Sequence, residues 1–216
     1  MPSPASLQFL LRSRRSVRRY KRKAVSRKDI KKILEAGRFT PTGLNRQGIR
    51  YIVITDPDRI ARLREMTLPA VMKLFAMAER IASLPFSSYL LGEQFIKDLK
   101  STYGPGLKLF YDRTKRGEDR LFYNAPAIML VHGEKVDDMA FSCPVALFNC
   151  SMMAHTLGIG CCLNGFLVLA ANHNTRIKQW LGIPRTHKCY GAMTLGYQGV
   201  AYSSLVKRNP VNVRWL

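Results

Sequence analysis

The sequence predicts an α+β fold, in which helices cover a sheet without alternating regularly with its strands. Three apolar runs rich in β-branched or aromatic residues are expected to be strands, at residues 49–56, 127–133 and 189–197, the first two of them buried. Helical patterns lie between these runs but do not follow each strand in turn, which disfavours a doubly wound fold. With 216 residues, 47% of them apolar, the chain can build one hydrophobic core, and we expect a single domain over residues 1–216.

Capping residues define the N-terminal elements. Ser6 is expected to cap a short helix with leucines on one face, and the basic segment after it reads as irregular or extended. Ser26 and Asp29 form a capping box in front of a second helix, whose apolar residues from Ile30 to Gly37 recur at helical spacing. The stretch "FTPTGLNRQG" then has the composition of a loop.

The middle of the chain is predicted to be helical from residue 58 to about residue 100. We expect breaks near Pro69 and Pro85 and an end at "TYGPG", residues 102–106. A long apolar helix is expected from about Pro144 to Leu157, stopping at Gly158. The tail beyond Tyr197 has no helical period and ends in Trp and Leu, which rarely lie in water, so something should bury it.

The charge is extreme and unevenly distributed. The formal net charge is +21, and the first forty residues hold thirteen Lys or Arg against two acids. Such a charge attracts any anionic partner without identifying it. The segment "RSRRSVRRYKRK", residues 12–23, holds eight of these cations, interleaved with Val17 and Tyr20. Because of this interleaving, we expect the segment to be ordered against the core.

No stretch is long enough for a membrane helix, and the N-terminus lacks a signal-peptide core, so a cytoplasmic protein with no membrane partner is expected. Five cysteines without paired spacing fit a reducing compartment. Cys161 and Cys162 are adjacent but lack further ligands at zinc-type offsets, so we expect no metal. His155, on the long apolar helix, is interpreted as a structural hydrogen-bonded group.

No side chain stands out as a catalyst. The glycine cluster "GIGCCLNG", residues 158–165, follows a helix and lacks the dinucleotide-binding spacing, but it suggests a tight backbone turn beside something planar or anionic. No catalytic triad, phosphate-binding loop, metalloprotease motif or carboxylate pair is present, and only 14 acids are available. A chain so poor in catalytic groups favours chemistry carried by a cofactor.

Three separated pieces resemble the FMN-dependent nitroreductase family, in the branch often associated with ferredoxin-fused members. They are "RRSVRRY" at residues 14–20, "TPTGLNRQGIRYIVI" at 40–54, and "LGIGCCLNGF" followed by "LGIP" and "YGAMTLGY"; the closing "KRNPVNVRW" adds to them. The resemblance implies a mainly antiparallel sheet flanked by helices, in an intertwined homodimer with two FMN sites at the interface. It also implies a variable helical region at about 67–120 and a C-terminal dimer arm at about 198–216.

The resemblance implies a set of cofactor-binding residues and no obligatory catalytic side chain. Arg14, Arg15, Ser16 and Arg18 would hold the FMN phosphate and ribityl chain, since arginine forms paired hydrogen bonds to phosphate. Arg208 would add a cation from the tail, and Lys207 fits less well by its offset from Pro210. Asn45 and Gln47 would bond the polar edge of the flavin ring. The backbone of Leu163, Asn164 and Gly165 would lie near flavin N5 and O4.

The implied function is that of an oxidoreductase working by a ping-pong cycle. NAD(P)H would reduce the flavin and leave, and a nitroaromatic, quinone or similar electron-poor acceptor would then take the electrons. Gly48 and Ile49 replace the usual Pro and aromatic after the N-x-Q motif, and Gln198 replaces a frequent Pro, which affects the substrate-pocket wall.

Two other hypotheses remain open at this stage. One is a basic nucleic-acid-binding protein on the same fold, although no recognised nucleic-acid motif is present. The other is a flavoprotein with different redox chemistry, such as dehydrogenation or reductive fragmentation. One phosphate does not need all the cations of the basic segment, which leaves four in surplus: Arg19, Lys21, Arg22 and Lys23. They are interpreted as a solvated face, or as groups that steer an anionic substrate, nicotinamide or redox protein partner.

Overall fold

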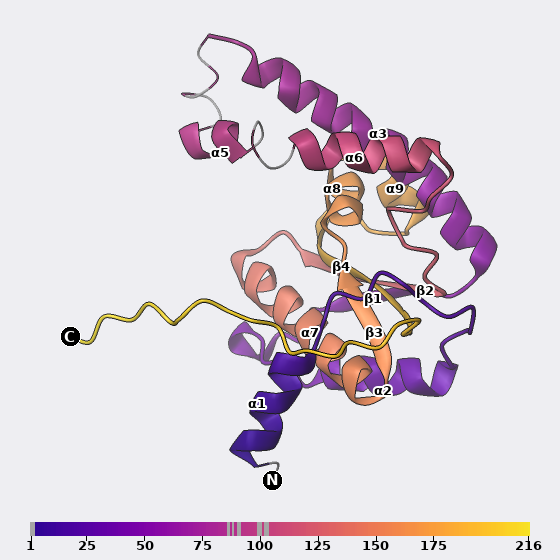
Figure 1. Ribbon diagram of the computed structural model, residues 1–216, viewed down its shortest axis with the longest axis vertical. Coiled ribbons are helices and arrows are strands. Elements are labelled where there is room, and N and C mark those ends of the chain that lie inside the picture. The colour runs from indigo at the N-terminus through magenta and orange to yellow at the C-terminus, as the bar shows by residue number, and fades with distance from the viewer. Residues whose placement is uncertain (1–2, 86, 88, 90–91, 99–100, 102–103) are drawn as a thin grey trace.

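A four-stranded antiparallel sheet lies at the centre of the computed structural model, which describes residues 3–85, 87, 89, 92–98, 101 and 104–216 (Figure 1). The strand order is β1-β2-β4-β3. The strands are β1 Arg50–Ile54, β2 Ala127–Glu134, β3 Ile159–Leu163 and β4 His187–Tyr197. Every neighbouring pair is antiparallel, which confirms the α+β prediction.

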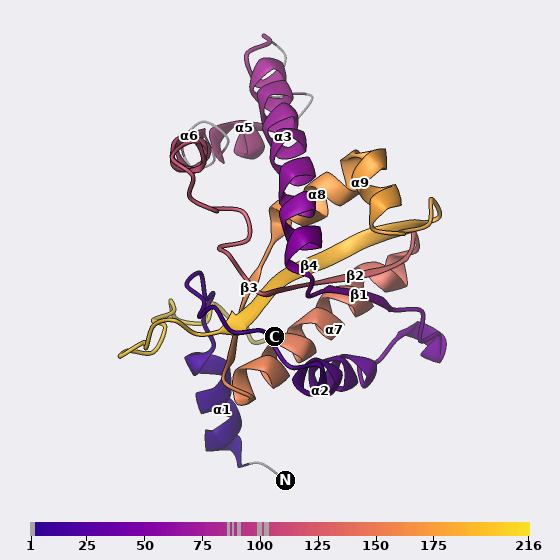
Figure 2. The same ribbon diagram turned by 90° about the vertical axis from the view of Figure 1, so that its right-hand side faces the viewer.

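Helices cover both faces of the sheet. The described helices are α1 Pro4–Ser13, α2 Arg27–Arg38, the 3₁₀ turn η1 Gly43–Asn45, α3 Pro57–Ala82, α5 Glu93–Asp98, α6 Gly104–Lys115, α7 Asp137–Thr156, α8 Gly165–His173 and α9 Thr175–Trp180. Helices α3, α8 and α9 lie on one side, and α2 and α7 on the other (Figures 1 and 2).

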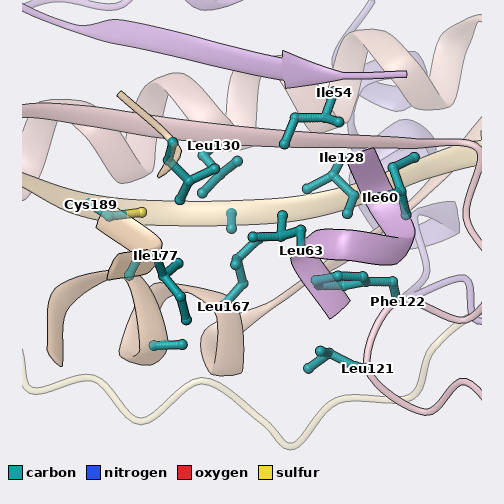
Figure 3. Close-up of a cluster of buried hydrophobic side chains, with 14 of the residues drawn as sticks. Ile54, Ile60, Leu63, Leu121, Phe122, Ile128, Leu130, Leu167, Ile177 and Cys189 are labelled. Carbon is teal, nitrogen blue, oxygen red and sulfur yellow. The ribbon is translucent and has the colours of Figure 1, made fainter. Parts of the chain in front are cut away.

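The alternation of side chains along the strands builds a separate core on each face. Ile54 and Ile128 point toward α3, α8 and α9, where they join Leu63 and Phe122 (Figure 3). The residues next in sequence, such as Met129, point the other way, toward α2 and α7. Since each fully buried large apolar side chain contributes about 1.5–3 kcal/mol, both cores hold their helices tightly.

Capping was predicted correctly for α2 and wrongly for α1. The Ser26 hydroxyl accepts from the Asp29 amide at 3.0 Å and donates to its carboxylate at 2.8 Å. Helix α1 instead begins after Ser3, whose hydroxyl accepts from the Ser6 amide at 3.2 Å. Both residues are serines three positions apart, so the sequence alone did not distinguish the two caps.

The helix boundaries predicted at Pro69 and Pro144 were wrong. Helix α3 continues through Pro69, and α7 begins at Asp137 and continues through Pro144. Neighbours of each proline are completely buried, Val71 in α3 and Cys143 in α7, so packing offsets the hydrogen bond that a proline removes. The break near Pro85 is confirmed, because α3 ends at Ala82.

The expected helix end at residues 102–106 lies partly outside the described residues, while the expected burial of the first strand and the glycine turn at residues 158–165 were wrong. Gly104 begins α6 instead of ending a helix, while Thr102 and Tyr103 lie outside the described part of the chain. Strand β1 is an edge strand and only half-buried, whereas β2 is buried as predicted. The predicted glycine turn at residues 158–165 is mostly strand β3, preceded by Gly158 at φ 70°.

The tail beyond β4 has no helix or strand and leaves the body of the protein, as Figure 1 shows. Most of its apolar residues are exposed, Trp215 at 88% and Val211 at 88%, so a single chain does not bury them, and the expectation that something buries the tail stays a prediction. Of the helices in the described residues, none combines the length and apolar character needed to cross a bilayer.

A pair of histidines joins β2 to β4 at one end of the sheet. His132 is 7% exposed, and its Nδ1 lies 3.0 Å from Nδ1 of His187, so one ring donates and the other accepts. Burial, the neighbouring His187, and the cations Arg50 and Lys178 lower the pKa of His132 to about 4. The pair therefore holds at most one proton between the two Nδ1 atoms at neutral pH.

This pair predicts a specific loss of stability in mild acid. In the unfolded chain His132 binds a proton below about pH 6.5, but in the folded chain it does so only near pH 4. Its contribution to the free energy of unfolding is therefore fully present above pH 6.5 and is lost as the pH falls from 6.5 to 4. The loss should be on the order of 2 kcal/mol. Chemical denaturation of wild type and His132→Gln at several pH values should give curves that converge toward pH 4. The matched exposed change His173→Gln should stay parallel to wild type, and parallel curves for His132→Gln would contradict the assignment.

Candidate flavin site

The basic segment forms an outer edge to the sheet. Ser16 makes a parallel bridge to Cys161 in β3, and the Val17 amide donates to the Cys161 carbonyl at 2.9 Å. The Val17 side chain is 1% exposed and packs over Gly160, where an added Cβ would lie 2.6 Å from a Val17 methyl carbon. Gly160 therefore lets the chain itself approach closely, and the segment is ordered against the core as predicted.

Tyr20 fixes the far end of the segment. Its hydroxyl donates to the Val17 carbonyl at 2.7 Å and lies 2.8 Å from the Thr194 hydroxyl on β4. Burial raises the pKa of Tyr20 well above its usual value, so the hydroxyl keeps its proton. Two hydrogen bonds and a buried valine thus hold residues 16–20 in one conformation.

Of the four basic-segment residues predicted to hold the phosphate and ribityl chain, Arg14, Ser16 and Arg18 lie along β3, whereas Arg15 points elsewhere. Arg14 lies next to Cys161, while Arg18 contacts Cys162 and the Tyr123 ring, 5.9 Å from the ring centroid. Ser16 reaches the Cys162 thiol. Arg15 instead donates to the Ser204 carbonyl and stacks over Tyr202 at 4.9 Å, so it binds the tail.

His155 is structural, as interpreted from the sequence. Its Nε2 lies 2.8 Å from the Ser13 hydroxyl, which joins the end of α1 to the last turn of α7. Burial, together with nearby Arg14, lowers the pKa of His155. The ring is therefore neutral at physiological pH and adds no charge beside the arginines.

Asn164 ends β3 and starts α8. Its side-chain oxygen accepts from the Leu167 amide at 2.9 Å, its side-chain nitrogen donates to the Leu121 carbonyl at 2.7 Å, and its own amide donates to Ala192 at 2.8 Å. Because these bonds engage the buried Asn164 side chain, this side chain fixes the backbone that would face a ligand. Leu163 beside it is 57% exposed.

Open space lies in front of Gly165. A Cβ added there would meet no atom of the described part of the chain within 4 Å, and the φ of Gly165 is not in the left-handed region, so the described fold does not require glycine. A cavity of about 640 Å³ lies beside Leu163, Asn164 and Gly165. Its other walls are formed by Phe148 of α7, Lys188 and Tyr190 of β4, and one face of α8. A cavity of this size suits a small planar ligand.

The loop that carries Asn45 and Gln47 is strained. Leu44, Asn45 and Gln47 adopt φ values of 49°, 53° and 49°, which cost about 1–3 kcal/mol each in residues other than glycine. Gln47 donates to Thr42 through its amide and to Asn45 through its side chain, and Gly43 donates to Asp138 at 2.7 Å. Backbone strain of this kind concentrates at functional sites, where the surrounding structure maintains it.

Helix α7 separates the two groups of predicted ligands. Asp138, in its first turn, holds the Asn45 loop, and His155, in its last turn, holds the segment before Arg14. These two α7 residues are about 25 Å apart at 1.5 Å per residue. The structure therefore brings Arg14, Ser16, Arg18 and residues 163–165 together in one chain, and leaves Asn45 and Gln47 apart.

Lys207 and Arg208 lie on the exposed tail. Neither makes an ion pair or a hydrogen bond within the part of the chain that the structure describes. Arg15 connects the basic segment to this tail, a contact that sequence reasoning missed because nothing in the pattern of residues indicates it.

The vicinal cysteines are protonated thiols. Burial raises the pKa of Cys161 to about 11 and also raises that of Cys162, despite the nearby arginines. Within the described residues no group of three His, Cys, Asp or Glu could hold a metal ion. These findings agree with packing as the role of both cysteines.

Sequence reasoning also missed Tyr123. This residue and Asn124 have φ values of 59° and 52°, and the Tyr123 ring lies between Arg18 and Arg120. The Asp119 carboxylate holds the turn by accepting from the amides of Leu121, Phe122 and Asn124. An aspartate shortly before a proline-flanked strand was the available signal, but it did not indicate which side chain would reach the arginines.

Comparisons with known proteins identify the family and agree with the fold. The family model described as "Nitroreductase family" matches residues 11–197. A nitroreductase with bound FMN from Desulfitobacterium hafniense is similar, with a TM-score of 0.67 at 20% identity over 96% of this chain and 97% of that one. An FMN-bound nitroreductase from Bacteroides fragilis gives 0.61 at 22% identity over 95% and 94%. A putative NADH oxidase from Clostridium acetobutylicum gives 0.57 at 18% identity over 93% and 94%.

The comparison with curated proteins gives no match. The structural similarities establish the fold, and the family model spans most of the chain, including the basic segment, the strained loop and β3. The chain therefore belongs to the nitroreductase family.

Proposed function

We propose that this protein is an FMN-dependent oxidoreductase whose cofactor lies along β3. The observation that carries the proposal is the strip of Arg14, Ser16 and Arg18 beside β3, the strand that leads to the open space at Gly165. From Cys161 to Gly165 an extended chain covers about 13 Å. That length accommodates an anionic phosphate at one end and a planar ring at the other.

The residues present fit such a cofactor. Arg14 and Arg18 supply charge-assisted donors to a phosphate, and Ser16 adds a hydroxyl donor beside them. The Gly165 backbone leaves room for a ring, and an amide in this turn can donate to it. Bound FMN would supply the electron-transfer chemistry, while the chain supplies position and electrostatics.

Surface properties support a homodimer. The accessible surface is 14496 Å², against about 10,000 Å² expected for a compact monomer of 24.6 kDa. Phe141, Val145 and Phe148 form an exposed stripe at i, i+4 and i+7 on α7, on a face that does not pack on the sheet. Helix α1 contains no buried residue, although Phe9 and three leucines lie on it. Such large exposed apolar surfaces mark an interface.

A two-fold dimer would also complete the site. If the α7 stripes of two chains pack antiparallel, the first turn of each α7 lies against the last turn of the other. The strained Asn45 loop of one chain would then reach the basic strip of its partner. The C-terminal arm, with its exposed Trp215, would be buried by the same association.

We propose NAD(P)H as the electron donor and a nitroaromatic, quinone or similar electron-poor compound as the acceptor. Both would use the 640 Å³ cavity in turn, in a ping-pong cycle. Its walls from Phe148 and Tyr190 suit planar aromatic substrates, and Lys188 favours anionic ones. Helices between about residues 67 and 120 are candidates for substrate selectivity.

Gly165→Val tests the proposed ring position. The fold has room for the side chain, so the variant should keep the wild-type melting temperature, but it should lose most of its flavin because the methyl groups enter the space of the ring. Gly106→Val on α6 is the matched control, since a Cβ there also meets no atom of the described residues within 4 Å. Flavin absorbance of the purified proteins measures the outcome, and a yellow Gly165→Val protein would refute this ring position.

Anaerobic stopped-flow spectroscopy tests the donor. Mixing the flavin-loaded protein with NADPH or NADH should bleach the flavin absorbance, and a quinone or nitroaromatic added afterwards should restore it. Steady-state rates at several acceptor concentrations should give parallel double-reciprocal lines, because donor and acceptor share one cavity. Flavin that neither nicotinamide bleaches would exclude NAD(P)H as the donor and favour a redox protein in its place.

A further inference from the structure

Three of the four surplus cations of the basic segment gather at a second hollow, away from the proposed flavin strip. Lys21, Arg22 and Lys23 line a groove of about 330 Å³ together with Arg64 of α3 and Asn124. We refer to these five residues as the basic groove. The Lys21 amide donates to the Tyr197 carbonyl at 2.9 Å, which fixes the groove at the end of β4, beyond the residues proposed to hold FMN.

The cations of the basic groove are poorly neutralised. Neither Lys21 nor Arg22 makes an ion pair within the described residues. Lys23 lies over the Tyr197 ring at 4.6 Å, and Arg64 meets Asp119 only at 3.9 Å. Four like charges held this close repel one another and create a positive potential that an anion would relieve.

The carboxylates nearby are already engaged. Asp119 itself lines the groove, accepts from three backbone amides and has a side chain that is 4% exposed, so its single negative charge offsets only one of the four cations. Asp56 caps α3 by accepting from the Arg59 amide at 2.8 Å and does not line the groove. The groove therefore keeps a net positive charge that the chain itself does not cancel.

Shape and lining define the class of ligand. The floor is apolar, formed by the buried Ile60 and Ala125 with Pro126 beside them, and the wall includes the side-chain amide of Asn124. Among the described residues no aromatic ring lines the groove, so these residues offer no platform on which the bases of a single-stranded nucleic acid could stack. A compact anion with a small apolar body fits these features better than a polymer.

We propose that the basic groove is a second anion site, which binds the phosphate group of a small phosphorylated molecule. Arg22 and Arg64 would donate to its oxygens, Lys21 would add a mobile ammonium, and Asn124 would contact the remainder of the ligand. The shared chemistry is phosphate recognition, whether by an inorganic phosphate or by a nucleoside phosphate. This site is independent of the proposed redox activity.

Calorimetric titration of FMN-saturated protein at low salt tests the site, because FMN then occupies its own phosphate ligands. The probes are inorganic pyrophosphate and 2′,5′-ADP. We expect saturable binding that weakens as salt is added, and a loss of at least about tenfold in affinity for the double variant Lys21→Gln/Arg22→Gln. Similar affinity for both probes assigns recognition to phosphate alone, and tighter binding of 2′,5′-ADP assigns it to a nucleoside phosphate.

The matched control is Lys31→Gln/Lys32→Gln, which makes the same change in charge on the exposed face of α2. It should bind as wild type does, and both double variants should keep the wild-type flavin content and melting temperature. Absence of binding to wild type, or equal weakening in the two double variants, would overturn the proposal. Flavin content is measured separately, so failure of the groove is distinguishable from failure of the proposed FMN site.

Discussion

Helix α7 sets the main constraint on how this chain can work, because it holds two groups of predicted ligands at opposite ends. Asp138 fixes the Asn45 loop and His155 fixes the basic segment, about 25 Å apart. No side chain spans such a distance. The exposed stripe that begins at Phe141 lies on the same helix, so the surface suited to pairing two chains is also the one that would reunite the ligands.

Close packing at the sheet edge holds the basic segment in place. A glycine at position 160 allows Val17 to bury its side chain, and Tyr20 bonds Thr194, so the backbone that carries the neighbouring arginines is fixed. Their charges then diverge in role: Arg18 faces β3, Arg15 binds the tail, and the cations after Tyr20 line a separate groove. One run of like charge in the sequence thus supplies three different surfaces.

The sequence correctly predicted those structural features that leave a pattern within a short stretch of residues. The capping box at Ser26 depends on neighbouring residues, and the apolar runs of β2 and β4 and the interleaving of Val17 and Tyr20 with cations are patterns visible in a short stretch of sequence, so all of them were indicated correctly. Helices through Pro69 and Pro144 depend on burial by distant elements, which no local signal reports. The contact of Arg15 with Ser204 joins positions 189 residues apart, and the split between Asn45 and Arg14 follows from the length of α7.

Subunit complementation tests the central claim that two chains share each site. One variant carries Arg14→Ala and Ser16→Ala, the other Asn45→Ala and Gln47→Ala, and each alone should purify without flavin. Co-expressed with different tags and isolated as a mixed dimer, they should recover about half of the wild-type flavin content, because one of the two sites then has only native residues. A mixed dimer without flavin, or a flavin-loaded monomer, would contradict a site built from both chains.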